Sequence, residues 1–422
     1  MVEAHANSTE DYLIEGLSFK LAPGASYVTN RRSVSFFPSG SDSYSPASGV
    51  KVIKLKLNGG SEWLDPSTVK VMFTLNNTSG SGNMTLLSGP HAFFRRMRIL
   101  CGGQIVEDID DYNRVCEMMN VLSSTQTRTN DAVEGAPTWD SAGGAETLAH
   151  TKKRTMGMKL LSGLMNQNKM LPIKYAPIEV ELELVNQATD AQQGATSWTI
   201  TDVQLKCDLV TLDNALDNSY AAHLLAGKSL PINYSTYISQ SQVTTASTFS
   251  INIARAATRL KSIFMNMIGA PSTTHTTNIK DFNNFWHPMS TGTTPGEYDA
   301  GLETEIQVQI GSKLFPEYPI RSASETFSQL RKTMGIHQSP FHSLDITPDR
   351  YRDYKFIAAI DTEKVLEAGF TGLNTRAGDL MTIKVQPVDA SGMGSTKPTK
   401  FFTVLHTDNI LEVKDVGVTV FD

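Results

Sequence analysis

The chain has 422 residues, of which 40% are hydrophobic and 8% aromatic, so it can bury a core in more than one domain and is not a disordered chain. Its formal net charge of −6 argues against a dominant basic face, and we expect no specific nucleic-acid binding. The start is acidic and polar, and no apolar run reaches the roughly 20 residues that span a bilayer. We therefore expect synthesis in the cytosol, with neither a secretory signal nor a transmembrane segment.

The first 50 residues combine turn-forming residues with apolar side chains. Prolines and glycines recur, at Pro23, Gly24, Pro38 and Gly40 among others, which argues against a continuous sheet. The stretch also holds Tyr27, Val28, Val34, Phe36 and Phe37, which are too apolar to lie free in water. We predict that this segment lies extended under the first domain or across a neighbouring particle, and we assign residues 1–24 as an N-terminal arm.

Strand-like segments dominate the rest of the chain. Apolar and polar residues alternate in each, which predicts antiparallel sheets with one buried and one solvated face. The clearest examples are residues 51–57, 69–75, 178–184, 198–203, 249–253, 263–267, 381–385 and 401–405. The final residues, 416–421, alternate in the same way and are predicted to be the last strand.

Two segments 209 residues apart share one pattern. Residues 97–108 and 306–317 each read as a hairpin with its turn at a glycine, Gly102 or Gly311, and a short helical pattern follows each. At the same offset, residues 205–213 and 414–422 both alternate with period two. The repeat predicts two copies of one β domain, over residues 25–213 and 230–422. The alternative is that short alternating segments match by chance.

A helix is predicted between the two copies. Leu212, Leu216, Tyr220, Leu224 and neighbouring apolar residues recur at a spacing near 3.6, so residues 214–229 read as a linker helix. Two long polar loops, at about 123–155 and 270–304, flank the repeated hairpins and read as functional insertions or poorly ordered segments.

Several short motifs resemble binding sites but lack the residues that the chemistry needs. Gly227-Lys228-Ser229 imitates the end of a phosphate-binding loop, yet Ala222 stands where a glycine is required, so Gly227 reads as a helix stop. His287, His337 and His342 lack the further ligands of a zinc site. Three cysteines have no metal-ligand spacing and are expected to be reduced thiols, namely Cys101, Cys116 and Cys207.

An acidic cluster, Glu107-Asp108-Ile109-Asp110-Asp111, could indicate a calcium site or a glycosidase carboxylate pair. It leads directly into a helical pattern at Tyr112, where acids complement the positive end of the helix dipole, and we favour that interpretation. No nucleophile, dinucleotide or catalytic signature is present in the sequence. We therefore predict no catalytic, cofactor-binding or metal-binding residues, no cofactor and no enzymatic activity.

Four segments resemble the major capsid proteins of small eukaryotic double-stranded DNA viruses, above all the polinton-like viruses. They are residues 25–34, residues 60–69, the long run FFRRMRILCGGQIVEDIDDYNR at 93–114, and residues 213–225, which resemble the inter-domain helix of the wider group that includes virophages and giant viruses. The second half of the chain matches this group in length and architecture more than in motifs.

This resemblance implies an all-β fold of two tandem eight-stranded jelly-roll β-sandwiches, with short helices in loops and in the linker. It implies a homotrimer that forms a pseudo-hexagonal capsomer and tiles an icosahedral shell, with neighbouring capsomers, penton and other minor capsid proteins as partners. The protein would be made in the host cytoplasm and end in the virion. Two alternatives stay open: a carbohydrate-binding or carbohydrate-active β-sandwich protein, and a minor capsid or spike protein.

Overall fold

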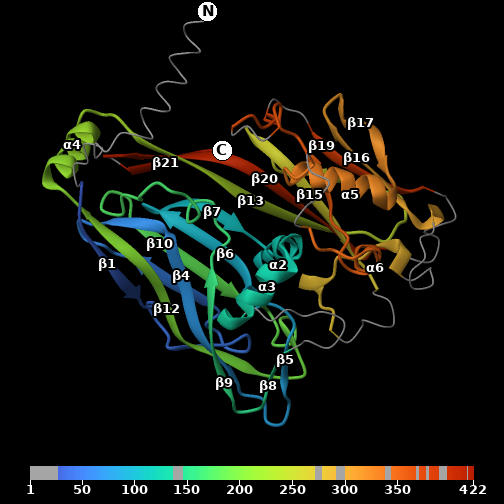
Figure 1. Cartoon of the computed structure of the whole chain (residues 1–422), viewed down its shortest axis with the longest axis horizontal. Coiled ribbons are helices and arrows are strands. Elements are labelled where there is room, and N and C mark those ends of the chain that lie inside the picture. Colours follow the sequence, from blue (N-terminus) through green and yellow to red (C-terminus); the bar gives the residue numbers. More distant parts are fainter. Residues whose placement is uncertain are drawn as a thin grey trace, which may run out of the picture.

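The computed structural model describes residues 27–135, 146–270, 278–290, 300–337, 344–366, 370–376, 380–388, 397–415 and 417–422. Figure 1 shows two β-rich lobes side by side, one from the first half of the chain and one from the second. The predicted arm at residues 1–24 and His342 lie outside the described residues.

The first lobe contains two facing four-stranded sheets. One has the order β1-β12-β4-β9 and the other has the order β3-β10-β6-β7. Their strands are β1 (Val28–Phe36), β3 (Val52–Leu57), β4 (Trp63–Asn77), β6 (Phe94–Cys101), β7 (Gln104–Ile109), β9 (Lys153–Lys159), β10 (Ile178–Leu184) and β12 (Trp198–Leu212). Short strands are added to this pair, namely β2 (Ser43–Tyr44) on β12 and a small sheet of β5 (Met84–Leu86), β8 (Glu146–Leu148) and β11 (Gln192–Gln193).

The second lobe repeats this order strand for strand. Its sheets are β13-β20-β15-β18 and β14-β19-β16-β17. The strands are β13 (Leu230–Val243), β14 (Phe249–Ile253), β15 (Leu260–Ile268), β16 (Thr304–Ile310), β17 (Lys313–Arg321), β18 (Ala358–Asp361), β19 (Met381–Pro387) and β20 (Lys400–Lys414). Two sandwiches of eight antiparallel strands in this order are jelly rolls, so the predicted fold class is confirmed.

Apolar and polar residues alternate along the strands, so each sheet places one apolar face in the core of its lobe. In β3, Ile53, Leu55 and Leu57 are fully buried while Lys54 and Lys56 are exposed. Burying one such apolar side chain contributes about 1.5–3 kcal/mol, so the register of each strand is fixed by its apolar face.

The hairpin repeat is confirmed. Gly102 joins β6 to β7 and Gly311 joins β16 to β17, with φ of +56° and +59°, a conformation that glycine adopts at little cost. A helix follows each hairpin, α2 (Tyr112–Leu122) and α5 (Ser322–Thr333).

The second landmark of the repeat was wrong. Residues 205–212 lie in β12, whose counterpart by strand order is β20, whereas the chain ends in β21 (Gly417–Phe421). β21 is an added strand that pairs with residues 410–414 of β20. The prediction failed because a period-two pattern identifies a strand but not its place in a sheet.

Two loop predictions also need correction. Residues 28–36 are not an irregular arm but the regular edge strand β1, which pairs with β12 through backbone hydrogen bonds despite the prolines nearby. The long polar loops contain local structure as well. The helices there are α3 (Thr125–Asp131), η2 (Ala132–Glu134), η3 (Asp281–Asn283), η4 (Pro288–Ser290) and η5 (Ala300–Leu302). The remaining short helices are η1 (Pro90–Phe93) and α6 (Pro348–Asp353).

The predicted helix between the lobes is present as α4 (Asn214–Leu225). Asp213 caps its start by accepting a hydrogen bond from the Ala215 amide at 3.0 Å. Gly227, with φ +76°, ends it, because the Gly227 and Lys228 amides donate to the carbonyls of Leu224 and His223. The exact domain boundaries of 25–213, 214–229 and 230–422 stay a prediction.

Candidate functional site

The residues that resembled catalytic or metal sites are held in structural roles. His287 is buried, which lowers its pKa to about 3, and its Nδ1 accepts a hydrogen bond from the Met289 amide at 3.1 Å. His337 is half-buried in the turn after α5. Gly227 is the helix stop described above. Within the described ranges, no group of three or more His, Cys, Asp or Glu side chains could hold a metal ion.

The three cysteines are free thiols, as expected. Burial raises the pKa of Cys101 and of Cys207 to about 12, which disfavours the reactive thiolate at neutral pH. Three of the four tryptophans, Trp63, Trp198 and Trp286, are at most 5% exposed and offer no surface on which a sugar could stack, while Trp139 lies outside the described residues.

The acidic cluster divides between strand β7 and the turn that precedes α2. Glu107 and Asp108 belong to β7, and Asp108 forms a bidentate ion pair with Arg96 at 2.7–2.8 Å. Asp111 precedes α2 in a left-handed conformation, and its side chain makes no capping hydrogen bond. The helix-dipole interpretation therefore does not explain the whole cluster, because Asp108 pairs within the first lobe while Asp111 lines the cleft between the lobes.

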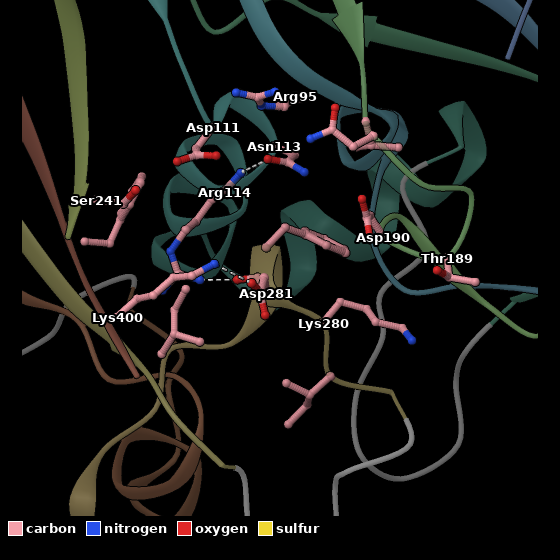
Figure 2. Close-up of a pocket in the computed structure, with 16 residues that line it drawn as sticks. Arg95, Asp111, Asn113, Arg114, Thr189, Asp190, Ser241, Lys280, Asp281 and Lys400 are labelled. Carbon is pink, nitrogen blue, oxygen red and sulfur yellow. Dashed lines mark hydrogen bonds and ion pairs between the residues drawn. The ribbon is translucent and has the colours of Figure 1, made fainter. Parts of the chain in front are cut away.

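Arg114 of α2 is the central side chain of that junction. It is 3% exposed, and its guanidinium crosses from the first lobe into the second. Nε donates to Asn266 Oδ1 of β15 at 3.1 Å, Nη2 donates to the Asn284 carbonyl at 2.8 Å, and Nη1 donates to the Asp281 carbonyl. Figure 2 shows the guanidinium reaching toward Asp281.

Two aromatic rings complete the surroundings of Arg114. Its Cζ lies 4.8 Å from the ring centre of Phe285 and 5.0 Å from that of Phe402. Among the described residues no carboxylate lies within ion-pair distance of it, and burial lowers its pKa to about 9. A cation stacked on rings and bonded to neutral oxygens fixes the angle between two elements more strongly than a surface ion pair would.

A second set of contacts joins β7 to β13. The Tyr234 hydroxyl donates to the Val106 carbonyl at 2.9 Å, and the Ser239 hydroxyl donates to the Asp110 carbonyl. Gly163, in the loop after β9, lies so close to β13 that a Cβ there would be 1.6 Å from the Ser235 carbonyl oxygen. Only glycine allows this approach.

Glu107 lies beneath these contacts and is 1% exposed. It accepts hydrogen bonds from the Gly163 amide at 3.0 Å and from the Ser162 hydroxyl. Burial raises its pKa to about 7, against the opposing effect of these hydrogen bonds. Over the part of the chain that is described, no basic side chain pairs with it.

A further group of charges lies where α2 and α3 meet the residues around α6. Burial alone would raise the pKa of Glu117, but hydrogen bonds from His91, at 3.0 Å, and from Ser88 lower it. Burial, together with Arg128 and Arg350, lowers the pKa of Lys355 to about 8. Charged groups from both lobes therefore lie close enough to shift one another's pKa.

A cleft of about 490 Å³ opens beside Arg114 (Figure 2). The first lobe contributes Arg95, Asp111 and Asp190 to its wall, and the second contributes Lys280 and Lys400, among other residues. Lys400 pairs with Asp281 across 3.0 Å. The walls carry both signs of charge, so the cleft has no single preference for an anion or a cation.

The junction was not predicted from the sequence. Arg114 closes the longest run that resembles capsid proteins, yet its partners lie 152 to 170 residues away. The available signal was an arginine among the apolar positions of a short helix, which indicates a buried partner without identifying it.

The fold resembles solved capsid proteins at low sequence identity. No protein-family model and no curated protein sequence matches the chain. The Faustovirus major capsid protein aligns with a TM-score of 0.62 and 9% identity, over 94% of this chain and 93% of that one. The PBCV-1 VP54 structure fitted into a reconstruction of the virophage Sputnik aligns with a TM-score of 0.61 and 12% identity, over 95% and 98%. The structure of the Sputnik virophage aligns with a TM-score of 0.59 and 8% identity, over 96% and 90%.

These likenesses establish the double jelly-roll architecture over nearly the whole chain. None of the helices in the described residues has the length and hydrophobicity needed to cross a bilayer.

Proposed function

We propose that the chain is a structural, non-catalytic protein, the major capsid protein of an icosahedral double-stranded DNA virus of the polinton-like type. In this proposal three copies form a pseudo-hexagonal capsomer, capsomers tile the shell, and penton and other minor capsid proteins complete it. The resemblance of the sequence motifs and the fold of the solved capsid proteins both support the proposal.

The trimer is supported by a difference between the two lobes: outer strands that are equivalent by strand order are not equally exposed. Within the chain, the outer strand of one first-lobe sheet, β7, packs against the edge strand of the second lobe, β13. Each lobe has the same two sides, because β17 is the counterpart of β7 and β1 is the counterpart of β13. The sides formed by β7 and β13 are therefore in contact inside the chain, whereas the sides formed by β17 and β1 are not.

The remaining pair is exposed. Six of nine β17 residues are exposed, against two of six in β7, and seven of nine β1 residues are exposed, against five of fourteen in β13. Both faces carry large apolar side chains, Leu314 and Tyr318 on β17, and Val28 and, just beyond the strand, Phe37 on the first lobe. Exposed apolar patches of this kind mark protein interfaces.

Joining β17 of one copy to β1 of the next repeats the contact that the chain already makes internally. Such a contact is heterologous, and it closes into a ring when the rotation between copies fits. Because each copy has two lobes, a ring of six similar lobes requires three copies. Obligate interfaces of this kind commonly bury more than about 2,000 Å².

The test is the native mass of the purified protein, with electron microscopy of the particles that it forms. We expect a trimer, and we expect Leu314→Arg with Tyr318→Arg to give a folded monomer. The matched control is Val133→Arg, which changes a side chain that is 90% exposed but lies in η2, away from both strands. A stable wild-type monomer at micromolar concentration would overturn the proposal.

A further inference from the structure

Several exposed apolar side chains belong to segments that lie near the hairpin turn at Gly102. We call five of them the turn-end surface. They are Ile105 (50% exposed), Val365 (58%), Leu366 (42%), Phe370 (37%) and Phe421 (46%).

Several contacts place these residues near one another and near the turn at Gly102. Arg259 bridges two of them, because its Cζ lies 5.4 Å from the Phe370 ring centre and its Nη2 donates to the Phe421 carbonyl at 3.3 Å. Val418 of β21 abuts Gly102, whose Cβ would lie 2.8 Å from it, so β21 reaches the turn that precedes Ile105. A hydrogen bond from the Lys364 amide to the Thr371 carbonyl at 3.0 Å closes the loop that presents Val365, Leu366 and Phe370.

The chain enters the first lobe beside the linker helix. The Tyr27 carbonyl accepts a hydrogen bond from the Asp213 amide at 2.8 Å, which fixes the start of β1 beside the start of α4. Figure 1 shows α4 and β21 along the same side of the molecule. Tyr27, at the start of β1, therefore lies on the side of the molecule along which β21 runs.

Those residues carry a pattern that matches this surface. Leu17, Phe19 and Leu21 alternate with Ser18 and Lys20, so an extended segment would have one wholly apolar face. From Tyr27 back to Leu17 is ten residues, which span up to about 33 Å when extended. That reach allows the apolar face to cover exposed side chains on β21 and on the loop before β19.

We propose that residues 17–21 bind the turn-end surface of their own chain, with Leu17, Phe19 and Leu21 packed on Phe370, Phe421 and their neighbours. A segment bound there connects the start of the first lobe to the end of the second. The proposal goes beyond the capsid role and does not depend on the trimer.

The first test is a photo-crosslink in the full chain. A photoreactive phenylalanine analogue at position 19 should crosslink within one chain to peptides that contain residues 364–371 or 417–422, as read by mass spectrometry. Crosslinks only between chains, or only to the first lobe, would overturn the proposal. Because the readout is intramolecular, it works whether the protein proves to be a trimer or a monomer.

The second test measures the apolar surface that the segment would cover. Replacing Leu17, Phe19 and Leu21 together by serine should increase the fluorescence of a dye that binds exposed apolar surface at least twofold. Ser18→Ala with Lys20→Ala, on the opposite face of the same segment, should leave it unchanged. Equal dye binding by wild type and the triple variant would contradict the proposal, and so would an equal increase in both variants.

Discussion

Arg114 shows how one side chain can set the arrangement of two lobes. Its removal would leave the Asn266 side chain and the Asn284 and Asp281 carbonyls without a donor at a buried junction. We expect Arg114→Met to lower the free energy of unfolding by about 3 kcal/mol or more, as for other broken buried polar networks. Urea unfolding measures this change. Lys56→Met, which removes an exposed pair with Glu179, should cost less than about 1 kcal/mol, and equal costs would contradict a special role for Arg114.

Glu107 should make stability depend on pH. Its pKa is raised from 4.5 to about 7 in the folded chain. Between these values the unfolded chain releases a proton that the folded chain keeps, so the free energy of unfolding falls as pH rises from about 4.5 to about 7. The limiting slope is about 1.4 kcal/mol per pH unit.

Thermal unfolding at pH 5 and pH 7.5 measures the effect of Glu107. Glu107→Gln should flatten this slope, because a neutral amide keeps the acceptor oxygen and cannot ionise. The control is Glu181→Gln, a buried glutamate whose carboxylate is paired with Lys54 and Arg98. A slope that survives in Glu107→Gln would assign the pH dependence to another group.

At the scale of elements, the added strand β21 completes the second lobe. It pairs edge to edge with residues 410–414 of β20, which include the buried Leu411 and Val413. We expect truncation after Asp415 to unfold the second lobe, seen as loss of one thermal transition, because the truncation exposes these side chains and an open strand edge. Truncation of residues 1–24 is the control and should leave both lobes folded while impairing shell assembly. Two equally harmless truncations would refute these roles.

The strands were predictable because their pattern is local, whereas the junction was not. The alternation of apolar and polar residues in β3, β10 and β19 indicates strands with one buried face, and Gly102 and Gly311 indicate turns. β1 was missed because its first six residues are exposed, and only Val34 and Phe36 at its end alternate toward the core. The contacts of Arg114 and the close approach at Gly163 depend on how the two lobes pack together, and no local sequence pattern predicts them.

For the whole molecule, the same contacts predict which part of the chain keeps the lobes together. α4 buries only Leu224 and is held mainly by Asp217, which pairs with Lys174 at 2.9 Å, and by Tyr220, whose ring centre lies 5.0 Å from that of Trp63. The junction, by contrast, holds Arg114, Glu107 and the β7 to β13 contacts.

Cutting the chain at a protease site inserted after Gly227 should therefore leave the two halves associated in size-exclusion chromatography. The same cut in Arg114→Met should leave a smaller fraction of the halves associated, because the variant loses the hydrogen bonds that Arg114 donates across the junction. Separation of the wild-type halves at micromolar concentration would show instead that the covalent linker keeps the lobes together.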